Sequence, residues 1–323
     1  MNSGTAGSRI LALGHYLPAR VVTNDELATT VDTSDEWIRT RVGISERRIA
    51  APDESVADMA TAAAAKTLAR SGLDSADVDL VVVATATAVD RMPNVAARVA
   101  SQLGIRTPAT FDVNVACSGF CYALALADLS LRGGAARNAL VIGADKMSDF
   151  LDWQDRTTCV IFGDGAGAAV LTATDETHGG VGPVVWGSEP DRGGAITLET
   201  TGPDGPPALF QQDGKAVYRW TTTTLAPIAR QACDRAGIDP ADLAGVVTHQ
   251  ANLRIIDMIV RRLGATNAVV ARDVVDSGNT SAGSVPIALA KLIDSGALTS
   301  GAPVLLLGFG AGLAYAAQVV HCP

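Results

Sequence analysis

The chain repeats itself, and this repeat limits its fold more than any other feature. The segment SGLDSADVDLVVVAT begins at Ser71 and resembles AGIDPADLAGVVTHQ, which begins 165 positions later at Ala236. The pair ALVIG and VLLLG has the same offset, and so does the pair CSGFCYALALADL and AGSVPIALAKL. Three separate matches in one register predict a duplicated fold. We place its two halves at residues 1–173 and 174–323.

Each half alternates helical segments with β-branched strands, an order typical of α/β proteins whose largely parallel sheets are covered by helices. The Ala-rich segment from Ser55 to Ser71 predicts a helix with Ser55 as N-cap and Gly72 as its C-terminal stop. The uncharged stretch 302–320 approaches the length of a membrane span. Its glycines instead favour two buried strands around a turn.

Composition narrows the classes of protein to which the chain can belong. Hydrophobic residues make up 48% of the 323 residues and aromatic residues 4%, so Ala, Val, Leu and Gly must supply most of the packing. The net charge of −9 argues against nucleic-acid binding, because neutralising phosphates needs a surplus of Lys and Arg. Five cysteines without disulfide or zinc spacing, and an N-terminus without a secretion signal, predict a reduced, cytoplasmic protein.

Cys117 is the strongest candidate nucleophile. It follows the apolar strand segment FDVNVA and precedes CYALALADL, which predicts a helix. The positive end of a helix stabilises a thiolate and lowers the thiol pKa, which activates cysteine as a nucleophile. The alternative is a small buried hydrophobic residue, the usual state of a free cysteine. We favour that alternative for the other four cysteines, Cys121, Cys159, Cys233 and Cys322.

His249 and Asn279 occupy positions where an α/β protein places functional groups. His249 follows the strand segment AGVVT, and loops after parallel strands commonly bind ligands. Asn279 lies in DSGNTSAGS, a turn before the helix that mirrors the one after Cys117, so the repeat would bring Asn279 near that cysteine. Each has an ordinary alternative: a hydrogen-bonded structural histidine, and an asparagine that only forms a turn.

Five motifs together resemble one family. They are ACSG at Cys117, HQANLRI at His249, GNTSAGSVP at Asn279, VDTSDEWIRTRVGI near the N-terminus, and FGDGAGAAV. In their order and spacing along the chain, from about Ile10 to Val320, they resemble β-ketoacyl-acyl-carrier-protein synthase III of the thiolase-like superfamily. The resemblance implies a five-layered αβαβα fold of two duplicated halves, a homodimer, and an active site made of Cys117, His249 and Asn279.

The resemblance also implies a reaction. An acyl-CoA primer would acylate Cys117, while the backbone N–H groups of Cys117 and Ala311 hold the oxyanion. Malonyl-acyl-carrier protein would then lose carbon dioxide as His249 and Asn279 donate hydrogen bonds to its thioester carbonyl. The carbanion would attack the acyl group and release a β-ketoacyl thioester. Decarboxylation drives this chemistry, so the family needs no metal and no cofactor other than coenzyme A carried by the substrate.

Further positions carry over from the same motifs as substrate-binding residues. Trp37 would stack on the adenine of coenzyme A, although a half-buried core residue is its ordinary alternative. Met92 occupies a stretch that lines the primer pocket in the family. The remaining expected contacts to the nucleotide and the pantetheine channel are Thr33, Arg41, Arg156, Gly214 and Asn252.

An acidic carrier protein would need a basic surface on this acidic chain. In LRIIDMIVRRLG the apolar positions Leu253, Ile256, Val260 and Leu263 predict one helix face, which leaves the arginines on another. A solvated charged face is the ordinary alternative. By resemblance, the carrier-protein contacts would be Arg219, Gln250, Ala251, Asn252, Leu253, Arg254, Arg261 and Arg262.

Three other functions compete with an enzyme that initiates fatty-acid or polyketide synthesis. A specialised relative could load an unusual starter unit or transfer an acyl group in a natural-product pathway, and Met92 and Ala311, where the family commonly has glycine, keep that reading open. A non-catalytic acyl-thioester-binding subunit would not need all three reactive residues. A degradative thiolase would need a second cysteine near the C-terminal turn, which here reads GFGAGLA.

Overall fold

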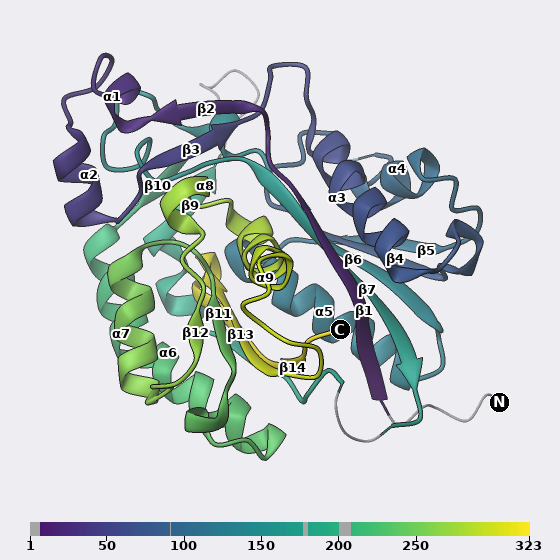
Figure 1. Cartoon of the computed structure of the whole chain (residues 1–323). Coiled ribbons are helices and arrows are strands. Elements are labelled where there is room, and N and C mark those ends of the chain that lie inside the picture. Colours follow the sequence, from purple (N-terminus) through teal and green to yellow (C-terminus); the bar gives the residue numbers. More distant parts are fainter. Residues whose placement is uncertain (1–6, 91, 177–179, 200–207) are drawn as a thin grey trace.

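A computed structural model describes residues 7–90, 92–176, 180–199 and 208–323. Two five-stranded sheets form its frame (Figure 1). The first has the order β1 (Gly7–Tyr16), β7 (Gly165–Thr174), β6 (Asn138–Asp145), β4 (Leu80–Ala84), β5 (Ala109–Val113). The second has the order β8 (Val185–Ser188), β14 (Ala314–His321), β13 (Pro303–Gly310), β11 (Gly245–Thr248), β12 (Val269–Val270).

The two sheets are copies of each other in order, direction and register. In each sheet, the first strand pairs antiparallel with the second, and the second with the third. The third, fourth and fifth strands pair in parallel. Leu80 pairs with Ala139 across β4 and β6, and Gly245 pairs with Val304 across β11 and β13. Both partners are shifted by the same 165 positions found in the sequence. The predicted duplication is confirmed, whereas its boundary at residue 173 stays a prediction.

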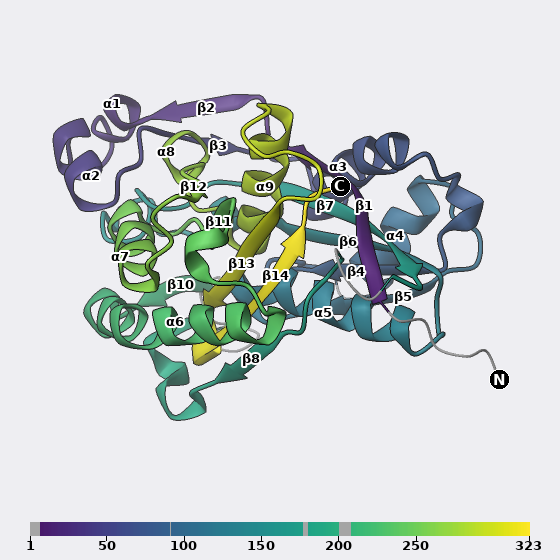
Figure 2. The same ribbon diagram turned by 60° about the horizontal axis from the view of Figure 1, so that its bottom comes forward.

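Helices complete the five layers, as Figures 1 and 2 show from two sides. The middle layer, between the sheets, holds α5 and α9. The outer face of the first sheet is covered by α3 and α4, and that of the second by α6 and α7. Their bounds are α3 (Val56–Ser71), α4 (Val95–Gln102), α5 (Gly119–Arg132), α6 (Gly214–Ala236), α7 (Leu253–Leu263) and α9 (Ser284–Asp294).

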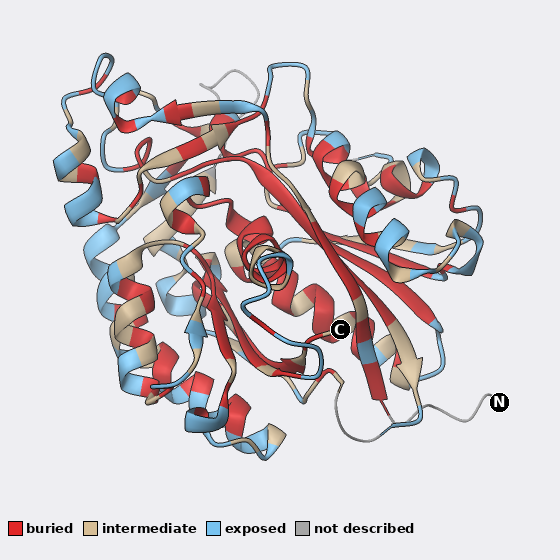
Figure 3. Ribbon diagram, viewed as in Figure 1, coloured by how far each residue is buried: buried red, intermediate tan, exposed pale blue. Residues whose placement is uncertain are grey.

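Three apolar cores hold these layers together, and Figure 3 shows the burial of strands and central helices. The central core joins α5 and α9 to both sheets, through residues such as Phe120, Leu289 and Leu306. One outer core lies under α3 and α4, and the other under α6 and α7. Because the middle helices are packed on both sides, the turns at their N-termini are held firmly between the two halves.

Several local predictions are confirmed. Helix α3 ends at Gly72 in the left-handed conformation (φ 75°), and Ser55 caps its start in a capping box with Asp58. Strands β13 and β14 occupy the uncharged C-terminal stretch and pair antiparallel around the predicted turn. Within the described residues, no helix combines the length and the apolar character needed to cross a membrane.

A smaller layer caps one end of the molecule. It contains the hairpin of β2 (Arg20–Thr23) and β3 (Glu46–Ile49) with the short helices α1 (Asn24–Leu27) and α2 (Asp35–Arg41). Arg47 fastens it from within: the fully buried guanidinium donates to the carbonyls of Val22 and Val160 and to Asn24 Oδ1. Two further short pieces lie nearby, the β9–β10 hairpin (Ile196–Glu199 and Leu209–Gln212) and α8 (Val274–Ser277).

Candidate active site

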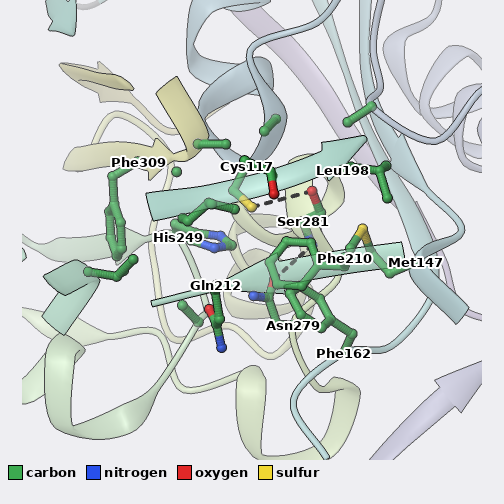
Figure 4. Close-up of a pocket in the computed structure, with 18 of the residues that line it drawn as sticks. Cys117, Met147, Phe162, Leu198, Phe210, Gln212, His249, Asn279, Ser281 and Phe309 are labelled. Atoms are coloured by element: carbon green, nitrogen blue, oxygen red, sulfur yellow. Dashed lines mark hydrogen bonds between the residues drawn. The ribbon is translucent and has the colours of Figure 1, made fainter. Parts of the chain in front are cut away.

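A cavity of about 100 Å³ lies where the two halves meet, and the three residues predicted to be reactive all line it. In Figure 4 the side chains of Cys117, His249 and Asn279 converge on this space from three segments far apart in the sequence. The structure therefore brings the predicted constellation together. Its lining is otherwise mostly apolar, which limits water around any reaction there.

Cys117 lies in the 3₁₀ turn Ala116–Ser118 that leads directly into α5, as predicted. Ala116 adopts a left-handed conformation (φ 45°), which is rare for a residue with a side chain and lifts the cysteine out of the strand-to-helix path. Gly310 packs against this turn so closely that a Cβ there would come within 2.8 Å of the Cys117 Cβ. Glycine is therefore required where the turn after β13 meets the cysteine, and Ala311, the next residue, also lines the cavity.

The thiol of Cys117 is held in its neutral form. Burial raises its pKa to about 12, a hydrogen bond with Ser281 opposes this rise, and the Asp145 carboxylate adds to it. The predicted lowering of this pKa by the helix N-terminus is wrong for the free protein, because desolvation of the thiolate exceeds the other effects. The nucleophile must therefore lose its proton to another group as it attacks.

Hydrogen bonds to the segment before β7 and to its own turn hold Asn279 in place. Its backbone N–H donates to the Ile161 carbonyl (2.9 Å) and its carbonyl accepts from Gly163 N–H (3.1 Å). The side-chain Oδ1 accepts from the backbone N–H of Ser281 at 2.9 Å. With the oxygen engaged, the Nδ2 amino group is the part of the side chain left to donate into the cavity.

His249 stands at the end of β11, where its backbone N–H donates to the Leu307 carbonyl (2.7 Å). The ring packs edge-on against Phe309, with centroids 5.1 Å apart, and Nδ1 lies 2.7 Å from Ser284 Oγ. Burial lowers the pKa of His249 to about 3, so the imidazole is neutral near pH 7. It can donate a hydrogen bond from one ring nitrogen and accept at the other.

A buried carboxylate ties the two halves together beside these residues. Asp145, at the end of β6, accepts from Ala86 N–H (2.8 Å), Thr87 Oγ1 (2.8 Å) and Thr85 Oγ1 (3.1 Å), all in the first half. Its other oxygen accepts from Ala282 N–H (3.0 Å), which belongs to the turn after Asn279. The carboxylate therefore joins the asparagine turn to the loop after β4, whose Ala86 also lines the cavity.

The wall opposite the reactive residues is apolar. Phe162 and Phe210 pack edge to face with centroids 4.6 Å apart, and Met147 and Leu198 lie beside them (Figure 4). These side chains come from the segment before β7, from the β9–β10 hairpin and from the turn after β6. An apolar wall facing a thiol fits a short acyl chain attached to that thiol.

The residues predicted to hold coenzyme A gather at the cap. The guanidinium carbons of Arg41 and Arg156 lie 5.8 Å and 5.4 Å from the centroid of the Trp37 ring. Arg156 also donates to the Asp32 carbonyl (2.9 Å) and to its carboxylate (3.2 Å). Thr33 lies next to this pair, and its hydroxyl is buried without a partner among the described residues.

Two other predicted contacts lie at the starts of α7 and α6. Asn252 caps α7 through Arg254 N–H (2.8 Å) and donates to the Arg41 carbonyl (3.1 Å), which joins α7 to the cap. Gly214 is the exposed first residue of α6, with open space where a Cβ would lie. Neither residue is among those that line the cavity.

Two of the sequence-based contacts need correction. Gln250 cannot face a carrier protein, because it is 0% exposed and its amide bonds internally to the Thr248 and Ala271 carbonyls and to Val274 N–H. Met92 does not line this cavity: it is 89% exposed on a loop of the first half. Ala251 lines the cavity, and its predicted contact with the carrier protein stays a prediction.

The basic residues on α6 and α7 differ in how free they are. Arg219, Arg254 and Arg261 are exposed, and the Arg254 guanidinium lies 5.7 Å from the Tyr218 ring centroid. Arg262 is also exposed but donates to the Thr222 carbonyl of α6, so its head group is engaged. The apolar face of α7 is broader than predicted, since Ile255 and Ile259 are buried while Leu253 and Val260 are only partly so.

Sequence reasoning missed three polar residues that shape the site, Ser281, Ser284 and Asp145. The repeat held the signal for the first: Ser281 lies 165 positions after Ala116, and both have a left-handed backbone (φ 49° and 45°). A residue in that conformation beside the Asn279 turn had to face the cysteine turn. Nothing in the sequence pattern distinguishes Ser284 or Asp145 from ordinary serine and aspartate.

Comparison with known proteins decides the family. The models for 3-Oxoacyl-[acyl-carrier-protein (ACP)] synthase III and for its C-terminal part match residues 111–190 and 233–322. The chain is 62% identical over 318 residues to β-ketoacyl-[acyl-carrier-protein] synthase III 4 of Streptomyces coelicolor, covering 98% of this chain and 99% of that protein. It belongs to the β-ketoacyl-acyl-carrier-protein synthase III family.

Solved structures of the synthase III family share the architecture. The priming β-ketosynthase from the R1128 polyketide biosynthetic pathway superposes with a TM-score of 0.96 at 42% identity, covering 100% of this chain and 98% of that one. A 3-oxoacyl-[acyl-carrier-protein] synthase III from Aquifex aeolicus gives a TM-score of 0.92 at 37% identity, covering 98% of this chain and 100% of that one. The expected thiolase-like αβαβα fold is confirmed, and the chain is a condensing enzyme of this acyl-transferring family.

Proposed function

We propose that this synthase III condenses an acyl-CoA primer, held as a thioester on Cys117, with malonyl-acyl-carrier protein to give a β-ketoacyl thioester. The observation that carries the proposal is the convergence of Cys117, His249 and Asn279 on one mostly apolar cavity. A nucleophile with two neutral hydrogen-bonding groups suits a reaction that passes through an acyl-enzyme and then an enolate.

In the first half-reaction the Cys117 sulfur attacks the primer thioester and expels coenzyme A. The raised pKa of the thiol means that its proton leaves during the attack, and the expelled coenzyme A thiolate takes up a proton as it departs. The backbone N–H groups of Cys117 and Ala311, held together by the Gly310 contact, are the proposed oxyanion hole. The wall formed by Met147, Phe162, Leu198 and Phe210 would enclose the acyl chain.

In the second half-reaction malonyl thioester takes the place of coenzyme A. Asn279 Nδ2 and a ring N–H of His249 would donate to the thioester oxygen while the carboxylate departs as carbon dioxide. The two donors stabilise the negative charge that develops on that oxygen, and the resulting carbanion attacks the acyl group on Cys117. The thioester bond to the sulfur breaks, and the free thiol returns.

The cluster of Trp37, Arg41 and Arg156 at the cap fits the proposed contact with the nucleotide of coenzyme A. Trp37 offers a ring face, and Arg41 and Arg156 offer guanidinium groups that suit both stacking and phosphate. Exposed Arg254, Arg219 and Arg261 on α6 and α7 would receive the acidic carrier protein. Because the Arg262 head group already donates to the Thr222 carbonyl of α6, we rank Arg254, Arg219 and Arg261 above Arg262 as carrier contacts.

We propose a homodimer that buries the loop of Val89 and Met92. Both apolar side chains are largely exposed, at 74% and 89%, and β5 lies at the edge of its sheet with β4 as its one strand partner among the described residues. An exposed edge strand near apolar side chains favours pairing with a second chain. Met92 could then serve a primer pocket only in the partner's cavity. A monomer by analytical ultracentrifugation at micromolar concentration would contradict this.

The choice between primary and specialised metabolism rests on the primer. A relative named as a priming β-ketosynthase of a polyketide pathway is similar throughout, so both a fatty-acid and a polyketide starter remain candidates.

The proposed location is the cytoplasm, where a nucleophilic thiol and four buried thiols stay reduced.

Intact-protein mass spectrometry tests the proposed function. The protein is incubated with a panel of acyl-CoA thioesters, with Cys117→Ala as the control. Short straight or branched acyl adducts that Cys117→Ala does not form would support an initiating synthase, and a bulky or unusual adduct would support a specialised starter unit. Adducts on both proteins, or on neither with every donor, would contradict the acyl-Cys117 intermediate.

A further inference from the structure

Ser284, the first residue of α9, contacts His249 without facing the cavity itself. Its hydroxyl is completely buried and lies 2.7 Å from Nδ1 of the imidazole. The same oxygen accepts the backbone N–H of Gln250, the residue after the histidine, at 3.3 Å. The Ser284 hydroxyl therefore contacts both the His249 ring and the backbone of Gln250, just after the end of β11.

The number of bonds a hydroxyl can form decides the direction of the contact with the ring. A serine oxygen has one hydrogen to donate and two lone pairs to accept with. One lone pair is taken by Gln250 N–H. A buried hydroxyl hydrogen needs an acceptor, and Nδ1 of His249 is the one acceptor recorded for it in the described part of the chain.

The opposite arrangement is disfavoured. If Nδ1 carried the proton and donated to Ser284, the serine oxygen would accept twice and its own hydrogen would be left buried without a partner, which costs free energy. A serine near a helix start commonly donates to a carbonyl three or four residues back. Here no such bond from Ser284 Oγ to a carbonyl is recorded among the described residues, and its partners are His249 Nδ1 and Gln250 N–H.

We propose that Ser284 is a positioning residue that donates to Nδ1 and thereby keeps the proton of His249 on Nε2. The inference rests on the proposed function and adds which role the imidazole plays in it. With Nε2–H facing the cavity, His249 is a hydrogen-bond donor in the resting enzyme, like the Nδ2 group of Asn279. The backbone of Ser281 orients the amide and the hydroxyl of Ser284 selects the tautomer, so both side chains present N–H groups to one thioester oxygen.

The tautomer also limits the reaction. An imidazole with its proton on Nε2 cannot accept the Cys117 proton at that atom until Nε2 has given up its own hydrogen. The resting enzyme is therefore prepared for the malonyl step rather than for deprotonating the thiol. We expect loss of the Ser284 hydroxyl to slow decarboxylation and to spare acylation.

The tautomer can be measured in the resting protein without any substrate. Protein labelled with ¹⁵N at histidine has only four such residues, and His249→Gln identifies the signals of His249. Long-range ¹H–¹⁵N spectra at pH 7 should show a protonated Nε2 and an unprotonated Nδ1 in the wild type. In Ser284→Ala the signals should move toward a mixture of tautomers. A protonated Nδ1 in the wild type would overturn the proposal.

Kinetics of the two half-reactions provide the second readout. Ser284→Ala should lower malonyl decarboxylation by about tenfold and leave Cys117 acylation within about twofold. Ser295→Ala is the matched control, because it removes a hydroxyl that bonds the Leu292 carbonyl at the other end of α9. Unchanged decarboxylation, or an equal loss of both half-reactions, in Ser284→Ala would overturn the proposal. If the wild type itself failed to form the acyl-enzyme, the proposed function would fail while the tautomer result stood.

Discussion

The cysteine turn, residues 114–119, and the asparagine turn, residues 279–284, occupy equivalent places in the two halves. The cysteine turn follows strand β5 and the asparagine turn follows helix α8, but each passes through a left-handed residue at Ala116 or Ser281 and leads through a 3₁₀ turn into a middle-layer helix. Both turns begin with an asparagine whose Oδ1 accepts from the N–H of the left-handed residue, but the other five side chains differ. The cysteine turn carries the one thiol of this chain that lines the cavity, whereas the asparagine turn carries an amide and two hydroxyls around it.

This difference shows how one backbone supports two halves of a reaction. The left-handed residue and the helix start are common to both turns, so they belong to the fold. The cysteine turn supplies the group that forms a covalent bond, and the asparagine turn supplies groups that only donate hydrogen bonds or orient others. Asp145, in the first half, holds the asparagine turn of the second half against the loop after β4.

The largest expected effect separates the two turns by half-reaction. Cys117→Ala should abolish acylation, because no other thiol lines the cavity among the described residues, and should retain malonyl decarboxylation in part. Asn279→Ala or His249→Ala should retain acylation and reduce decarboxylation by at least about a hundredfold. Mass spectrometry of the acyl-enzyme and release of labelled carbon dioxide measure the two steps. Equal loss of both steps in every variant would remove the division of labour.

Asp145→Asn should loosen the contact between the asparagine turn and the loop after β4. An amide can keep only one of the two accepting oxygens, so either the Thr87 side or the Ala282 side loses its bond. We expect about 1–3 kcal/mol less unfolding free energy in urea and about tenfold slower condensation. The pKa of Cys117 should fall, since the Asp145 charge raises it, and alkylation by iodoacetamide at pH 8 should become faster. Slower alkylation with unchanged stability would contradict this role.

The pH dependence of the unfolding free energy compares the neutral His249 of the second half with the neutral Cys117 of the first. The folded pKa of His249 is lowered to about 3 from 6.5, so the unfolded chain binds more protons between these values and stability falls as pH decreases through that window. Between pH 7 and pH 4.5 this effect of His249 should lower the unfolding free energy by on the order of 2 kcal/mol. His249→Gln should lose less stability than the wild type between pH 7 and pH 4.5 in urea unfolding.

Cys117 acts in the opposite direction. Its folded pKa is raised to about 12 from 9.0, so the unfolded thiol ionises first and stability falls as pH rises above 9. Cys117→Ala should therefore flatten the alkaline side of the stability profile. Identical slopes for the variants and the wild type on both sides would show that burial does not keep these groups neutral.

The smallest expected effect concerns the two left-handed residues. Ala116→Gly and Ser281→Gly both relieve an unfavourable backbone conformation, and each should raise unfolding free energy by about 1 kcal/mol or less. Only Ser281→Gly removes the hydrogen bond to the Cys117 thiol, at 3.4 Å, which lowers its pKa. Alkylation of Cys117 should slow in Ser281→Gly and stay unchanged in Ala116→Gly. The same response in both would mean that the Ser281 hydroxyl has no influence on the thiol.

Much of this molecule could be predicted from its sequence because the relevant signals are local or repeated. The 165-residue offset predicted the duplication, and the pairings of Leu80 with Ala139 and of Gly245 with Val304 are related by the same offset. Capping at Ser55 and Gly72 and the motifs around Cys117, His249 and Asn279 depend on neighbouring residues, which a sequence displays directly.

Tertiary structure alone decided the electrostatics and the orientation of the site. The pKa of Cys117 rises rather than falls because desolvation depends on how the two halves close around the thiol. Gln250 proved to be buried. Ser284 proved to contact His249, and Asp145 the asparagine turn, because these partners come from distant segments. Sequence spacing determines which elements form, whereas burial and hydrogen-bond direction arise only when layers from both halves pack against each other.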